Sequence, residues 1–235
     1  MAKKKQKEQN QPLDSTEETL MSLEQSLTKT ELYIEENKNS LSLIVGAIIV
    51  IFAAYYAYKE YYVKPKGVEA QNTLFAAENQ FRNGNYDLAL NGEEGGHAGL
   101  LDVIDDFSGT PAGDLAQAYA GLSYAKQGDF ATAIDYLEAY KGSGTVSEPI
   151  IKGALADCYA ETGDLDKAFA TYKEAAQLND NKLSAPVMWS KAAMMAEALS
   201  KTEEAKTIYQ ALVKDYESTR EGQEAKKMLA KLGVY

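Results

Sequence analysis

The sequence predicts an all-α protein that consists of a tail with one amphipathic helix, a single transmembrane helix, and an α-solenoid with a C-terminal capping helix. Three observations support this fold class. An uncharged, apolar run of 18 residues covers 41–58, a pattern of small and aromatic residues recurs every 35 to 44 residues after it, and one amphipathic segment ends the chain. Such features are typical of a membrane anchor followed by stacked helical repeats.

Composition and charge limit the functions that the chain can have. With 45% hydrophobic and 25% charged residues, the composition is that of a globular protein, which excludes disorder throughout, collagen and a multi-span membrane protein. The net charge of −11 has the wrong sign for neutralising phosphates, so no nucleic-acid partner is expected. Cys158 is the one cysteine, which excludes an internal disulfide and a Cys/His zinc set.

The apolar run predicts a transmembrane helix over residues 41–62. At ~1.5 Å per residue the uncharged part covers roughly 27 Å, about one hydrocarbon core. A buried core helix is the alternative. Lysines flank both ends of the run in similar number, and the cluster within the first seven residues favours a cytoplasmic N terminus. Ala53 and Ala57 form a small-x3-small pair, which suits contact with a neighbouring membrane helix and equally well with lipid.

Residues 1–40 are predicted to form a cytoplasmic tail. Leu20, Leu27 and Ile34 recur at intervals of seven, with Leu23 beside them, which predicts a narrow apolar stripe on a helix. Lipid headgroups, a partner subunit or a second copy of the chain are the candidates for covering this stripe. The alternative is a mostly solvated helix with no specific role.

A self-similar pattern fills the second part of the chain. Residues 121–137 contain G-x2-Y-x3-G-D-F-x2-A-x3-L, and residues 156–172 repeat it 35 positions later; related copies begin at Ala77 and Ala193. This period, with small residues where two helices approach closely, matches the tetratricopeptide signature of about 34 residues per helical pair. Gly-Asp ends the first helix and caps the second. Ala133, Ala168 and Ala205 are expected to lie early in each second helix.

These copies predict a tetratricopeptide domain over 63–235, with repeats around 67–110, 113–145, 148–181 and 185–217 and a cap over 220–235. The repeats lack the signature's tryptophan and terminal proline. In the first repeat, residues 98–107 are interpreted as a displaced second helix that follows a glycine-rich loop over 91–97. The amphipathic segment 221–232 is interpreted as the helix that covers the last apolar face of the solenoid.

The order of these parts resembles a known family. A basic tail, one span and repeats containing GLLDVIDDF, AYAGLSYAKQGDFATAIDYL and TGDLDKAFATYKEAA are similar to the single-span tetratricopeptide proteins represented by the ancillary subunit of the SecYEG translocon, and to their longer-tailed, Bacteroidota-type relatives. This resemblance covers roughly residues 41–235. It implies a bacterial inner-membrane protein with a periplasmic domain, which lies beside SecYEG and a membrane-anchored periplasmic chaperone of the prolyl-isomerase type.

No residue pattern predicts catalysis, a cofactor or a metal site. His97, the one histidine, has acidic neighbours but no second histidine, so a solvated loop residue is expected. Cys158 has no basic neighbour in sequence and is expected to be a packed thiol. Trp189 is interpreted as a packing residue, with a ligand contact as the alternative. Adjacent acidic pairs such as Glu93–Glu94 do not face each other on a helix and are assigned no chemistry.

The candidate binding surface comes from the repeat register. Tetratricopeptide domains bind peptides along the first helix of each pair, and the register places Leu122, Asp157, Glu161, Met194 and Glu197 there. An apolar and acidic surface disfavours capture of a terminal carboxylate and favours extended apolar or basic segments of unfolded secretory proteins or of a partner chaperone. A solvated surface that binds no ligand is the alternative. The sequence therefore predicts a non-catalytic scaffold at the translocon. A scaffold of another envelope complex, in division or outer-membrane assembly, is the alternative.

Overall fold

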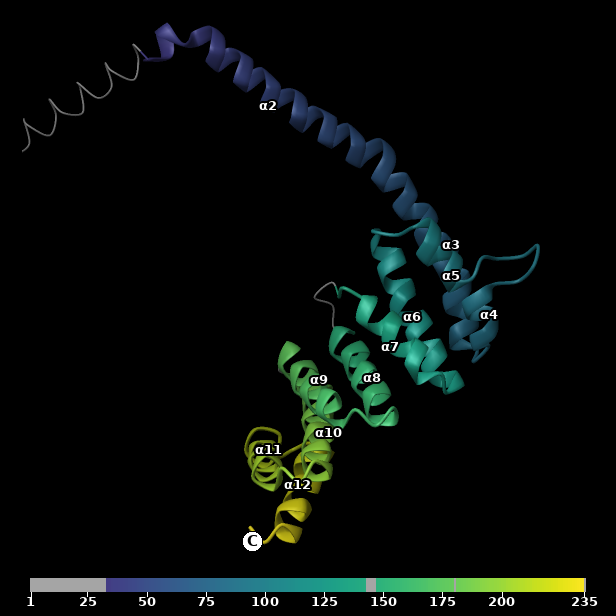
Figure 1. Ribbon diagram of the computed structural model, residues 1–235, viewed down its shortest axis with the longest axis vertical. Coiled ribbons are helices and arrows are strands. Elements are labelled where there is room, and N and C mark those ends of the chain that lie inside the picture. The colour runs from purple at the N-terminus through teal and green to yellow at the C-terminus, as the bar shows by residue number, and fades with distance from the viewer. Residues whose placement is uncertain (1–32, 143–146, 180, 235) are drawn as a thin grey trace, which may run out of the picture. The chain divides into compact units, whose positions relative to one another are not determined.

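The computed structural model describes residues 33–142, 147–179 and 181–234 (Figure 1). Every regular element among these residues is a helix, so the all-α prediction is confirmed. The chain divides into two compact units, one that ends at Tyr62 and one that covers Val63–Tyr235. The amphipathic helix predicted for the tail lies outside the described residues, apart from its last turn.

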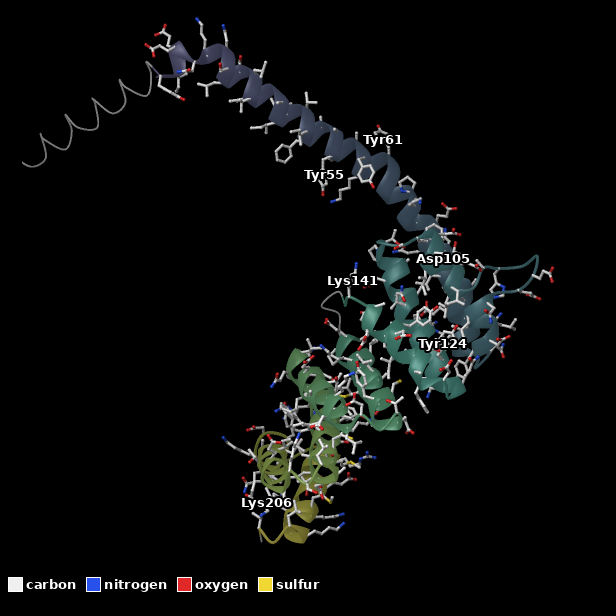
Figure 2. The ribbon with its side chains drawn as sticks, viewed as in Figure 1. Tyr55, Tyr61, Asp105, Tyr124, Lys141 and Lys206 are labelled. Carbon is white, nitrogen blue, oxygen red and sulfur yellow. The ribbon has the colours of Figure 1, made fainter. Side chains whose placement is uncertain are left out.

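The first unit contains a helix that meets the length and composition required to cross a membrane. It consists of α2 (Lys38–Tyr58), which the π-helical turn η1 (Lys59–Val63) follows. An 18-residue window here has a mean hydropathy of 2.2, and none of it is buried against protein. Figure 2 shows large side chains such as Tyr55 projecting from this helix. By length and composition, this apolar and exposed helix is a candidate membrane span.

Ten helices of the second unit are described, and neighbours in sequence pack on one another. The close pairs include α6 with α7, α8 with α9, α10 with α11, and α11 with α12, while α7 also packs on α8 and α9 on α10. This is the contact pattern of a solenoid. The helices are α3 (Lys64–Arg82), α4 (Tyr86–Asn91), α5 (Leu100–Asp106), α6 (Pro111–Gln127), α7 (Phe130–Ala139), α8 (Glu148–Glu161), α9 (Leu165–Leu178), α10 (Ala185–Ala198), α11 (Thr202–Asp215) and α12 (Arg220–Lys231).

The turns within the two middle pairs follow the predicted Gly-Asp chemistry. Gly128 and Gly163 have φ angles of 85° and 84°, a left-handed conformation that glycine adopts without a Cβ clash. Each following aspartate caps the next helix: the Asp129 and Asp164 side chains each accept a backbone N–H at 3.2 Å. The last pair departs from this pattern, because Ser200 takes the left-handed position with φ 59°.

Small residues allow the two helices of a pair to approach closely. Ala133, Ala168 and Ala205 are completely buried, as the repeat register predicts. On the facing helix of the second pair, a Cβ at Gly121 would lie 2.6 Å from Cγ of Leu137, so no larger residue fits without movement.

The first repeat has one helix more than predicted. The helix expected within residues 98–107 is present as α5, after the glycine-rich loop, and a short helix, α4, begins directly after Gly84–Asn85, as in the other repeats. Both helices pack on α3 and on α6. The loop closes at its neck, where a Cβ at Gly92 would lie 2.6 Å from the Gly99 nitrogen. Asp102 then accepts the Gly99 N–H at 2.9 Å and starts α5. The interpretation of residues 98–107 as a helix is therefore confirmed, and α4 is the addition.

The solenoid ends on α12, which packs on α11 and also contacts α10. Thr219 caps this helix, since its hydroxyl accepts the Gly222 N–H at 3.1 Å and donates to the Tyr216 carbonyl at 2.8 Å. Ala225 and Leu229, two residues of α12, are buried. The helix therefore covers the last apolar face of the repeats, as expected of a cap.

Candidate functional site

The predicted binding residues all lie on the first helices of their pairs. We call them the first-helix surface. Leu122 on α6 is half-buried, Glu161 at the end of α8 is exposed, and Met194 on α10 is 53% exposed although it is apolar. The remaining members of the surface are Asp157 on α8 and Glu197 on α10.

Asp157 is engaged by its own protein. Its carboxylate accepts the Tyr172 hydroxyl from α9 and the Lys191 ammonium from α10, the latter at 2.6 Å. The Lys191 Nζ atom also lies 5.4 Å from the centre of the Tyr172 ring. This carboxylate therefore joins three helices, and its charge is largely balanced before any ligand arrives.

Glu197 makes a similar bond in the last repeat. It accepts the Tyr209 hydroxyl of α11 at 2.5 Å. Tyr172 and Tyr209 occupy the same repeat position, which Leu137 fills in the second repeat. Glu161, in contrast, has no hydrogen bond or ion pair within the described part of the chain. Of the three acidic residues of the first-helix surface, Asp157 is paired with a cation, whereas Glu161 and Glu197 keep their negative charge, because the partner of Glu197 is a neutral hydroxyl.

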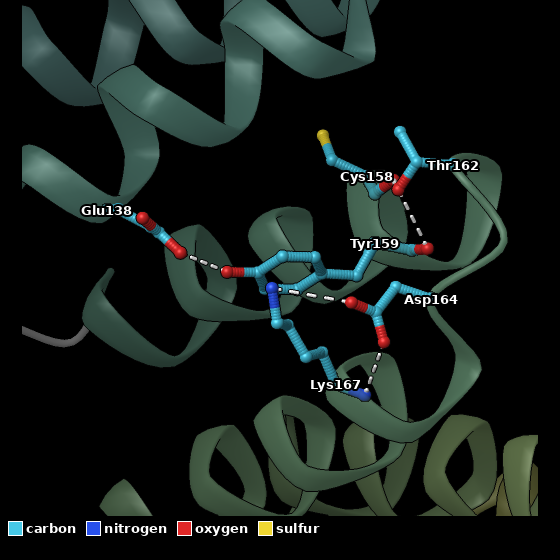
Figure 3. Close-up of polar contacts among 6 residues, drawn as sticks. All are labelled: Glu138, Cys158, Tyr159, Thr162, Asp164 and Lys167. Carbon is cyan, nitrogen blue, oxygen red and sulfur yellow. Dashed lines mark hydrogen bonds and ion pairs between the residues drawn. The ribbon is translucent and has the colours of Figure 1, made fainter.

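Tyrosine hydroxyls join helices elsewhere in the solenoid too. Tyr119 of α6 donates to Glu78 of α3 at 2.8 Å, and Tyr159 of α8 donates to Glu138 of α7 (Figure 3). Burial, followed by the bond to Glu78, raises the pKa of Tyr119 to about 12. Burial, followed by the bond to Glu138, likewise raises the pKa of Tyr159. These bonds could not be predicted from the repeat register, because the two partners lie 21 to 41 residues apart and the acceptor changes position from repeat to repeat.

The surroundings of Cys158 give it a structural role. It is 1% exposed, and the neighbouring Thr162 hydroxyl donates to its carbonyl at 3.0 Å. Burial raises the pKa of the thiol to about 11, and the charges of Asp157 and Glu161 add to this effect. A thiol that stays protonated at neutral pH is a poor nucleophile and a poor metal ligand.

His97 lies in the loop between α4 and α5. Its Nδ1 atom is 3.9 Å from a Glu93 carboxylate oxygen, and its Nε2 atom is buried without a hydrogen-bond partner. Its side chain is 22% exposed, so the expectation of a solvated histidine was wrong in part. Over the described residues, no three His, Cys, Asp or Glu side chains gather in a way that could hold a metal ion.

The tetratricopeptide repeat family matches the chain at residues 116–142 and 189–219. These stretches cover α6 with α7 and α10 with α11. Trp189 opens the second stretch, four residues before Ala193, and this is the tryptophan position of the signature. The expectation that no repeat carries this tryptophan was therefore wrong for the last repeat.

Solved structures of helical-repeat proteins resemble the chain in fold. The crystal structure of BtubC (BKLC) from P. vanneervenii has a TM-score of 0.52 at 15% identity, covering 79% of this chain and 78% of that one. A Podosopora anserina putative kinesin light chain with nearly identical TPR-like repeats gives a TM-score of 0.48 at 16% identity, with 72% and 95% coverage. No curated protein sequence matches the chain.

Two matched repeats, the alternating helical pairs and the capping helix together assign the fold. Identity of 15% to the solved structure supports the fold alone and transfers no function. Tetratricopeptide repeats serve as surfaces for protein–protein interaction. The second unit is a tetratricopeptide-type α-solenoid, and its repeats make the chain a protein-interaction scaffold.

Proposed function

We propose that this protein is a non-catalytic, membrane-anchored scaffold and an ancillary subunit of the SecYEG translocon. One observation carries the proposal: the same chain joins a single exposed apolar helix, α2, to a tetratricopeptide-type solenoid. The resemblance to the longer-tailed, Bacteroidota-type translocon proteins supplies the partner. The N terminus is then cytoplasmic and the solenoid periplasmic, in the bacterial inner membrane.

The mechanism is tethering. An anchored solenoid stays near the exit of the translocon, so emerging secretory proteins or a membrane-anchored prolyl-isomerase-type chaperone meet it at raised effective concentration. Even weak contacts then hold a client long enough for a chaperone to reach it. No reaction step is needed.

The first-helix surface is the proposed contact for clients. Met194 and Leu122 offer apolar surface, and Glu161 offers an unbalanced negative charge. This chemistry suits an extended segment that carries apolar and basic residues. The acidic charge is also unfavourable for a terminal carboxylate.

Affinity purification of the intact chain from native membranes in mild detergent, followed by mass spectrometry, tests the partner. We expect SecY, SecE and SecG together with a periplasmic chaperone. Enrichment of a division or outer-membrane assembly complex without them would refute the translocon assignment and favour the alternative scaffold. Protease treatment of spheroplasts tests the orientation: the solenoid should be cleaved before the membrane is lysed.

Client binding is tested at Glu161. The Glu161→Lys variant should reduce photo-crosslinking of secretory clients to a probe placed at Met194, because it reverses the charge of the exposed carboxylate there that has no partner among the described residues. Glu94→Lys is the matched control, since it makes the same charge change on an exposed loop residue. Asp157→Lys is a poorer test because it also removes the bonds to Tyr172 and Lys191. Unchanged crosslinking in Glu161→Lys would remove the first-helix surface from the proposal.

A further inference from the structure

The last turns of the four first helices carry a row of residues at one register position. Each member lies five residues after the small residue of its helix, so each occupies the same place in its repeat. We call this set the end row; in chain order it consists of Arg82, Lys126, Glu161 and Ala198. All four are exposed, at or next to the C-terminal residue of α3, α6, α8 and α10. The end row lies one helical turn beyond Leu122, Asp157 and Met194, so it continues the first-helix surface, with which it shares Glu161.

Two ion pairs balance most of the charges in and near the end row. Arg82 binds Glu78 of the same helix, with 2.5 Å between the guanidinium and carboxylate atoms. One turn before Glu161, the Asp157 carboxylate accepts the Lys191 ammonium at 2.6 Å. These four side chains therefore offer little net charge to a ligand.

Two members of the end row keep an unbalanced charge, and the two charges have opposite signs. Lys126 and Glu161 are exposed, and neither forms a hydrogen bond or an ion pair with any described residue. Their helices are neighbours, because α6 contacts α8 as well as α7. In the next repeat Glu197 also keeps its negative charge, since its partner is the Tyr209 hydroxyl. The surface is thus positive in the second repeat and negative in the third and fourth.

Helix stability does not explain the negative charge of Glu161. The C-terminal end of a helix carries a partial negative charge, which favours cations and disfavours carboxylates there. Arg82 and Lys126 follow this rule at the ends of α3 and α6, whereas Glu161 is the last residue of α8 and opposes it. No cation in the described part of the chain pairs with it to offset this cost. A residue that opposes the local preference without compensation is expected at a binding site.

We propose that this charge pattern orients an extended client segment, with an acidic residue beside Lys126 and a basic residue beside Glu161. The proposal rests on the first-helix surface as the client contact and adds the composition and direction of the bound segment. Packed neighbouring helices lie about 8–10 Å apart, and an extended chain advances about 3.3 Å per residue. The two charges of the segment are therefore about three residues apart. Phe75 on α3 and Met194 on α10, 59% and 53% exposed, offer apolar contacts on either side of them.

Two synthetic peptides test the orientation on the full-length protein in dodecyl maltoside. The acid-first peptide is Leu-Ser-Asp-Ser-Ser-Lys-Ser-Leu, and the base-first peptide has Asp and Lys exchanged. Each carries a benzophenone on its N terminus and an amide at its C terminus, and mass spectrometry locates the crosslinks after irradiation. We expect the acid-first peptide to crosslink to α3 at least fivefold more than to α10, because the residues before its Asp lie on the α3 side of Lys126. The base-first peptide should prefer α10 by at least fivefold.

Exchange of the two protein charges shows whether they set this preference. The double variant Lys126→Glu with Glu161→Lys keeps the net charge and should invert the preference of both peptides. Lys214→Glu with Glu94→Lys is the matched control, since it makes the same exchange at exposed residues outside the first helices. This control should change each preference less than twofold.

Three results would each overturn the proposal: equal crosslinking of α3 and α10, a preference that survives the charge exchange, or no crosslink to either helix. The peptides replace clients and no translocon is present, so these results do not depend on the proposed partner. An error in the partner would instead appear as the absence of SecYEG from the affinity purification, so the two failures are distinguishable.

Discussion

Replacement of Gly222 by alanine is expected to detach the capping helix. A Cβ at this position would overlap the carbonyl group of Tyr216, with 2.8 Å to its carbon, and would lie 3.1 Å from the Leu212 oxygen. Both are backbone atoms of the preceding helix and its end, so no side-chain rotation relieves the clash. The first turn of α12 has to move away from α11.

The magnitude follows from the contacts that this movement weakens. The cap bond from Gly222 N–H to Thr219 contributes about 1 kcal/mol, and the buried side chain of Leu229 contributes about 1.5–3 kcal/mol. Alanine is a better helix former than glycine by about 0.5–1 kcal/mol, which offsets part of the loss. We expect Gly222→Ala to lower the free energy of unfolding of the last repeat by about 2–3 kcal/mol.

Urea unfolding followed by tryptophan fluorescence measures this effect. The chain has one tryptophan, Trp189, and α10, which carries it, contacts α12. Gly67→Ala is the matched control, because no atom lies within 4 Å of its Cβ position and it too lies within a helix. It should stabilise the protein by about 0.5–1 kcal/mol. A Gly222→Ala protein as stable as the unaltered chain would refute the packing argument.

Three further outcomes are expected. Tyr172→Phe should lower the free energy of unfolding by about 1–2 kcal/mol, because the bond to Asp157 is lost. The pKa of Tyr172 is raised in the folded state, so its contribution to stability is constant below pH 10 and is lost as the pH rises above that value. In urea unfolding at increasing alkaline pH, the stability of the variant should therefore fall less steeply than that of the unaltered protein. Ser200→Gly should raise the thermal unfolding midpoint, because it removes about 1 kcal/mol of strain from a serine in the left-handed conformation. Gly163→Ser introduces the same strain and should lower the midpoint. Cys158, with a pKa of about 11, should react with iodoacetamide at pH 8 at least a hundredfold more slowly when folded than in urea, as mass spectrometry would measure; comparable rates would contradict its burial.

The parts of the fold that depend on local chemistry could be predicted from the sequence. A helix end followed at once by a helix start is predicted by Gly128-Asp129 and again by Gly163-Asp164, and the structure has both turns. The last repeat has Ser200-Lys201 instead, and its turn still forms. Only the spacing from Ala193 to Ala205 identifies it, which shows that packing of the small residues imposes the turn when the turn residues do not favour it.

The parts that depend on tertiary contacts could not be predicted. A helix over 98–107 was expected after the glycine-rich loop, but nothing local indicates that this helix and α4 both pack on α3 and α6. Asp157 was correctly placed on a first helix, yet the register alone could not show that Tyr172 and Lys191 occupy its carboxylate.

The closed neck of the loop between α4 and α5 has a practical consequence. Because Gly92 and Gly99 lie against each other, the six residues between them leave and re-enter the solenoid at nearly one point. A peptide tag or a small fluorescent reporter inserted between Glu94 and Gly95 would therefore lie outside the repeats and would not separate α4 from α5. The loop offers an internal attachment point for following the protein in cells, leaving the apolar helix and the capping helix unaltered.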